Sequence, residues 1–124
     1  MTRAVRLFLF WEAAAFSAAA LVHFGVILHG YEHREAGTAE SVIAAVLFLA
    51  LVWTWIRPRS TRWAGLVSQA FALFGTFVGL FTIAIGIGPR TGPDIAYHIG
   101  IIAVLVFGLI VTARAQRGRA AQQT

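Results

Sequence analysis

Residues 21–40 have the sequence LVHFGVILHGYEHREAGTAE, and this stretch decides the fold. An apolar run ends inside it, polar residues follow, and a second apolar run begins. The same stretch carries three of the four histidines and three of the five acidic residues of the chain. The pattern predicts that one helix ends here, that another begins, and that chemically useful side chains gather at the junction.

Composition places the chain in the membrane class. Its 124 residues are 59% hydrophobic and only 12% charged, and the mean hydropathy is +0.78. Soluble domains carry about 25% charged residues. The length allows a single domain over residues 1–124, and the absence of cysteine excludes disulfides and thiolate metal ligands.

The chain contains four apolar runs, each near the ~20 residues that cross a bilayer as a helix. Irregular backbone cannot face lipid, so the prediction is an all-α transmembrane four-helix bundle with up-down-up-down order. The predicted helices are 5–28, 39–56, 63–87 and 95–113, with polar outer loops at 29–38 and 88–94 and a basic tail at 114–124.

Local signals set the expected helix ends. Thr38 is the expected N-cap of the second helix, and Arg57-Pro58 ends that helix. The fourth helix opens with a capping-box pattern, in which Thr91 and Asp94 flank a proline in the first turn. The first run is expected to be retained rather than cleaved as a signal peptide, because it continues to Leu28 and contains Glu12.

Arginine distribution predicts the orientation. Eight of the ten arginines lie at one membrane face, which places both termini in the cytoplasm. All basic residues are arginine and none is lysine, which suggests a GC-rich bacterial genome. Together with the four apolar runs, this predicts a multi-pass protein of the bacterial inner membrane. Arginines at the ends of apolar runs are topology signals, so nucleic acid is excluded as a partner. These arginines are Arg3, Arg6, Arg57, Arg59, Arg62, Arg114, Arg117 and Arg119.

Polar residues inside the apolar runs need an explanation. Glu12 and His23 lie three turns apart on one face of the first helix. Gln69 and Thr76 form a similar stripe on the third helix, and Glu12 and Gln69 lie at similar depth. We therefore expect a Glu12–Gln69 hydrogen bond inside the bundle. It is either a structural clasp or part of a proton relay, in which Thr76 also takes part.

Ionisable residues also gather at the predicted outer face. His23 and His98 are expected at similar depth on different helices, and Asp94 stands four residues before His98, where its carboxylate can orient the imidazole. Glu40 is expected in the first turn of the second helix, whereas Glu35 is a solvated loop acid. The candidate metal ligands are His23, His29, Glu32, His33, Glu40, Asp94 and His98.

Imidazoles with carboxylates are typical ligands of zinc, iron, copper or manganese ions. His23 and His98 are alternatively a pair that holds haem b from both sides. The competing interpretation is that His29 and His33 are ordinary loop residues and that His98 only pairs with Asp94.

The chain resembles the many small four-helix bacterial inner-membrane proteins for which no function is defined. Its length is also similar to that of DoxX-like proteins and small fluoride channels. It has neither the asparagine-glycine pattern of the channels nor a DoxX signature, so no residue role is transferred. The segments that carry the resemblance are Tyr31-Glu32-His33, Ala39-Glu40 and Asp94-Ile95-Ala96-Tyr97-His98.

Three hypotheses for the function follow. The favoured one is a membrane protein that binds a metal ion or haem at its outer face for redox chemistry, metal handling or sensing. The second is a small proton-coupled transporter or channel. The third is an accessory subunit of a larger membrane complex, and a homo-oligomer also remains open. Enzymatic activity stays uncertain because no motif specifies a substrate.

Overall fold

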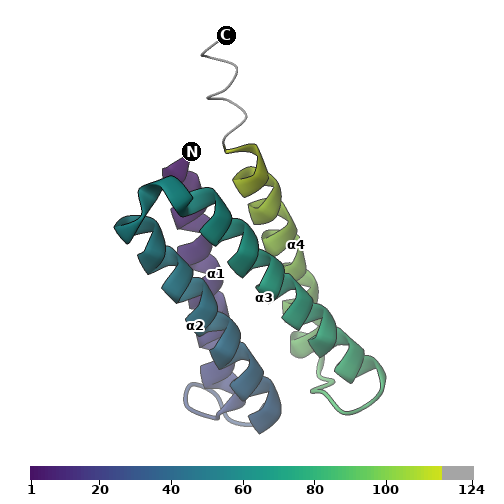
Figure 1. The fold of residues 1–124 in the computed structure, drawn as a ribbon. Coiled ribbons are helices and arrows are strands. Elements are labelled where there is room, and N and C mark those ends of the chain that lie inside the picture. The colour runs from purple at the N-terminus through teal and green to yellow at the C-terminus, as the bar shows by residue number, and fades with distance from the viewer. Residues whose placement is uncertain (116–124) are drawn as a thin grey trace.

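The computed structural model describes residues 1–115, and these form four long α-helices. Consecutive helices run in opposite directions, so the four helices have an up-down-up-down order (Figure 1). All four are long and apolar enough to cross a membrane. The helices are α1 (Thr2–His23), α2 (Arg34–Ile56), α3 (Thr61–Ala84) and α4 (Gly92–Arg114), with a short 3-10 helix η1 (Pro58–Ser60) between α2 and α3.

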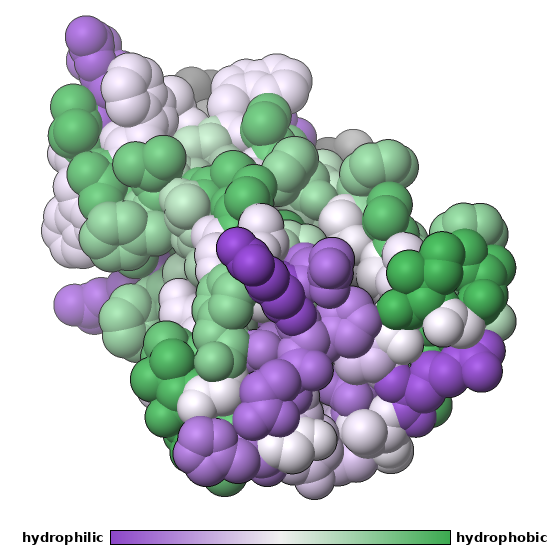
Figure 2. Space-filling view, turned by 90° about the horizontal axis from the view of Figure 1, so that it is seen from below, coloured by the Kyte–Doolittle hydropathy of each residue, from purple (hydrophilic) through white to green (hydrophobic). Residues whose placement is uncertain are grey.

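The bundle has two chemically different ends. The arginine end holds the start of α1, the α2–α3 connection and the end of α4, at the top of Figure 1. The acidic end holds the loops 24–33 and 85–91. Figure 2 looks onto the acidic end, where hydrophilic side chains extend from the middle to the lower edge of the view, with hydrophobic ones on the left and right.

The bundle consists of two helix hairpins, α1–α2 and α3–α4, which are joined mainly by α2 and α3. α1 packs most extensively against α2, and α3 packs against α2 almost as extensively as against α4, while α1 contacts α3 and α4 less. Leu9, Phe16, Leu47 and Leu105 form the centre of the apolar core. Large apolar residues such as Phe74 also cover the outer surface. Because lipid is as apolar as these side chains, close packing and buried polar contacts hold such a bundle together.

The first and third helices end earlier than predicted, at His23 and Ala84. Gly25 and Gly86 follow these ends with φ of 71° and 87°, a left-handed conformation that glycine adopts without penalty. The amide of Gly25 donates to the carbonyl of Val22, and the amide of Val26 to that of Leu21. These two bonds form a Schellman motif, which terminates a helix although the following residues are still apolar.

The second helix begins earlier than predicted, so the expected Thr38 N-cap is wrong. His33 has an extended backbone, and its Nδ1 accepts a hydrogen bond from the amide of Ala36. Thr38 lies inside α2 and donates to the carbonyl of Arg34. Glu40 therefore lies in the second turn of α2, where the first turn was predicted. A histidine cap has no strong sequence signal, which explains the error.

The remaining helix ends lie within three residues of the predicted positions. α2 stops at Ile56, directly before Arg57-Pro58. Thr91 caps α4 in a capping box with Asp94, as predicted, although the helix begins at Gly92 and not at residue 95. Arg114 closes α4, and residues 116–124 of the predicted basic tail lie outside the described residues.

Candidate functional site

His23 lies between two carboxylates at the acidic end. Its Nδ1 is 2.7 Å from Oε2 of Glu40, and its Nε2 is 2.9 Å from Oδ1 of Asp94. The exposed fractions of His23, Glu40 and Asp94 are 4%, 5% and 6%. The three residues come from α1, α2 and α4, so this cluster, which we call the acidic-end triad, joins three helices. It also confirms that α4 lies beside α1, as convergence of the candidate residues requires.

The hydrogen bonds of Asp94 locate one of the two protons of the triad. Its Oδ2 accepts from the amide of Thr91 at 3.2 Å and from the Thr91 hydroxyl. An ionised carboxylate only accepts hydrogen bonds, so the Asp94 Oδ1 atom accepts as well. The donor of the bond between His23 and Asp94 is therefore Nε2–H of His23. The second bond, between Nδ1 and Glu40, needs one proton, which either partner can carry. In both arrangements the triad has a net charge of −1.

His98 makes a different contact from the one predicted. Its Nδ1–H donates to the main-chain carbonyl of Asp94 at 2.7 Å, so the expected pairing with the Asp94 carboxylate is wrong. That carboxylate is occupied by His23 and Thr91. A residue four positions earlier in a helix presents both its main-chain carbonyl and its side chain to the imidazole, so Asp94 can pair with His98 through either group. The Nε2 atom of His98 lies against Gly79, where a Cβ would be 2.9 Å away.

A cavity of about 160 Å³ lies between α2, α3 and α4 at the acidic end. His33 and Glu35 line its mouth, and Glu40, Tyr97 and His98 line its interior together with Thr76. Within residues 1–115, the Tyr97 hydroxyl is the one fully buried side-chain N or O atom without a hydrogen-bond partner. Leaving a buried hydroxyl without a partner costs free energy.

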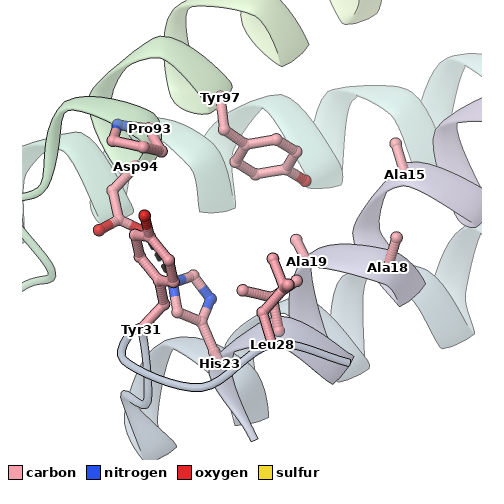
Figure 3. A pocket seen from close by; sticks show the side chains of 10 residues that line it. Ala15, Ala18, Ala19, His23, Leu28, Tyr31, Pro93, Asp94 and Tyr97 are labelled. Atoms are coloured by element: carbon pink, nitrogen blue, oxygen red, sulfur yellow. Dashed lines mark hydrogen bonds and ion pairs between the residues drawn. The ribbon is translucent and has the colours of Figure 1, made fainter. Parts of the chain in front are cut away.

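A groove of about 580 Å³ lies on the other side of the triad, between α1 and α4. Figure 3 shows Ala15, Ala18 and Ala19 along one wall, with the Tyr97 ring projecting from α4. His23 and Asp94 lie at one end of the groove, joined by a hydrogen bond. The triad and Tyr97 thus separate two hollows at the acidic end of the bundle.

A second buried polar cluster lies nearer the arginine end. Gln69 Nε2 donates to both carboxyl oxygens of Glu12, at 3.0 and 3.1 Å, so the predicted contact is present. The Thr112 hydroxyl donates to Gln69 Oε1 at 2.9 Å. We call these three residues the buried clasp. Sequence reasoning missed Thr112. This residue lies on the same helix face as His98, because positions 98, 101, 105, 108 and 112 are separated alternately by three and four residues.

Apolar side chains separate the triad from the buried clasp. Phe16, Ala72, Ile101 and Leu105 belong to the core between them. Thr76 reaches the cavity, but its hydroxyl donates to the carbonyl of Ala72. The polar groups therefore form two layers, and the described side chains do not make a continuous polar path through the bundle.

The other predicted ligands lie outside the triad. His29 is almost fully exposed, with Nδ1 3.4 Å from Glu32 Oε1. His33 Nε2–H donates to the carbonyl of Ile87 at 3.1 Å, which connects the two acidic-end loops, and its ring centroid is 6.5 Å from that of His23.

The geometry does not favour a metal ion or haem. In the part of the chain that the structure describes, no three or more His, Cys, Asp or Glu side chains are grouped to hold a metal ion. The triad carboxylates sit at opposite nitrogens of the His23 ring, so both nitrogens are occupied and the ligand atoms surround no common point. Metal and haem binding stay predictions, which elemental analysis and a visible spectrum of the purified protein decide.

Glu32 gives a pH prediction for the loop 24–33. Hydrogen bonds from the backbone amides of Glu32 and Gly30 hold the pKa of this carboxyl below its ordinary value of 4.5. The ionised carboxylate therefore stabilises the loop above pH 4.5, and this contribution is lost as the pH falls through the lowered pKa. We expect the Gly30 amide signal in an NMR titration to move with a midpoint below 4.5 and to stop moving in Glu32→Gln.

Comparison of the chain with protein-family models, curated proteins and solved structures gave no match.

Proposed function

We propose that the protein is a small proton-coupled membrane transporter whose acidic-end triad binds the coupling proton. The observation that carries this proposal is the position of His23, held between Glu40 and Asp94 of two other helices. Imidazole changes its charge near physiological pH, which suits a group that takes up and releases protons.

The number of buried ionisable groups supports a functional role. A charged side chain at the centre of a bilayer costs at least ~2.5 kcal/mol, and such residues usually mark ion or proton pathways. Two clusters of this kind occur in this small bundle, at the triad and at the buried clasp. The titratable groups that face His23 are Glu40 of α2, Asp94 of α4 and His33 of the first loop.

The triad is also placed to control the packing of the hairpins. The His23–Asp94 bond and the bond from His33 to the Ile87 carbonyl both connect the α1–α2 hairpin to the α3–α4 hairpin. Protonation of Asp94 weakens the first bond and lets the hairpins separate at the acidic end. The Glu12–Gln69 contact joins the same hairpins nearer the other end. Alternate opening of the two ends moves protons past the apolar layer without a continuous channel.

We further propose the orientation that the charges favour. The described residues of the arginine end carry six arginines, whereas the acidic end carries two, Arg34 and Arg90, together with Glu32, Glu35, Glu40 and Asp94. The positive-inside rule then places both termini in the cytoplasm of a bacterium, with the acidic end facing outward.

Glu12→Gln is expected to reduce proton uptake on the order of 10²-fold, because a relay carboxyl is removed while the hydrogen bond to Gln69 is kept. The measurement uses proteoliposomes that contain a pH-sensitive dye, with a potassium diffusion potential, negative inside, as the driving force. Wild-type vesicles should acidify faster than protein-free vesicles. Glu32→Gln, which changes an exposed loop acid, is the matched control. Equal uptake in Glu12→Gln and wild type, or none in either, contradicts the proposal.

A further inference from the structure

We propose that the cavity between α2, α3 and α4 binds a small monovalent cation with N–H donors, namely ammonium or a small primary alkylammonium ion. Binding rests on the residues of the cavity alone. Only the role of this ion as the transported substrate rests on the proposed function, so the two are tested in different preparations.

The charge of the site favours a cation. The two hydrogen bonds of the triad require two protons, and with two protons the triad carries a net charge of −1. Glu40 belongs to the triad and also lines the cavity. Glu35 adds a second carboxylate at the mouth. A negative group that is shielded from water gains strongly from a counter-ion, so an anion or a neutral apolar molecule is disfavoured.

The polar atoms of the cavity wall favour an N–H donor. Glu40 uses Oε2 for His23, and His98 donates through Nδ1. Within residues 1–115, Glu40 Oε1 and His98 Nε2 make no hydrogen bond, and neither is a fully buried unpaired atom, so both remain accessible to a molecule in the cavity. A carboxylate oxygen and an imidazole lone pair both accept N–H hydrogen bonds.

Size and ligand count restrict the ion further. A cavity of about 150 Å³ accommodates a molecule the size of benzene, so 160 Å³ admits ammonium and short amines but no lipid-sized amphiphile. Calcium takes six to eight oxygen ligands, more than this wall offers. Among residues 1–115, no side-chain group suited to a metal ion occurs either.

The test is equilibrium binding of radiolabelled methylammonium to the full-length protein in detergent. We expect saturable binding of one ion per chain that ammonium displaces and tetramethylammonium does not, because the latter has the same charge but no N–H donor. Glu40→Gln removes the charge at constant shape and should abolish binding. Gly79→Ala places a methyl group 2.9 Å from His98 Nε2 and should weaken binding about tenfold to a hundredfold.

Gly100→Ala is the matched control, since a Cβ at this α4 position meets nothing within 4 Å. It should bind as wild type does, and the thermal melt of each variant shows whether it is folded. No saturable binding to the wild type, or equal displacement by tetramethylammonium, overturns the proposal and leaves a cavity that holds water. If methylammonium binds but vesicles take up no protons, the cation site is retained and the proposed transport is refuted. If vesicles take up protons but methylammonium does not bind, the transport is retained and the cation site is refuted.

Discussion

Gly108→Ala is expected to destabilise the protein by about 2–5 kcal/mol, the sum of overpacking and of buried polar groups left unpaired. A Cβ at this position of α4 would lie 2.5 Å from Glu12 Oε1 and 2.6 Å from Gln69 Nε2. Both side chains are completely buried, so neither can swing away into solvent. The methyl group therefore breaks the buried clasp or pushes α4 away from α1 and α3.

Unfolding of the purified protein in detergent measures this effect, with Gly100→Ala as the control on the same helix. Because a Cβ at residue 100 meets nothing within 4 Å, this exchange should be neutral or stabilise the helix by about 0.5–1 kcal/mol. If the two variants unfold alike, the clasp contributes nothing to stability, and Gly108 has no steric role in bringing α4 close to Glu12.

The sequence predicted the four-helix bundle because apolar runs of membrane-spanning length leave few alternatives. It predicted the helix ends less well, and residues 24–28 show why. Four of these five residues are apolar, so hydropathy continues across a position where the chain has already left the helix. The turn at Gly25 depends on backbone hydrogen bonds of the Schellman motif, and these follow from conformation rather than polarity.

The residues of the triad were all predicted as candidates, but their pairing was not. Within one helix, spacing alone relates Asp94 to His98. The contact from Asp94 to His23 depends on how α1 and α4 are rotated against each other, and a single sequence does not contain this information. Glu12 and Gln69 were paired correctly because depth in the membrane and the small residues around them left one arrangement.

His23→Phe is expected to destabilise the protein by about 3–5 kcal/mol at neutral pH, the usual cost of leaving a buried charge without its partner. The phenyl ring keeps the flat shape of the imidazole, is somewhat larger and donates no hydrogen bond, so Glu40 and Asp94 are left as two buried carboxylates that repel each other. The loss should become smaller at acidic pH, because the carboxyl groups then take up protons and lose their charge. Unfolding in detergent at several pH values measures it, and His29→Phe, at an exposed position, is the control.

A triple variant separates the structural role of the triad from its role in proton coupling. Adding Glu40→Gln and Asp94→Asn to His23→Phe removes the unpaired charges, so most of the lost stability should return. Proton uptake in vesicles should nevertheless stay absent, since no group of the triad can then change its charge. A stable triple variant with wild-type uptake would show that the triad only holds α1, α2 and α4 together. A variant that stays unstable at every pH would show that the shape of the imidazole, and not the charge it balances, decides the packing at this end.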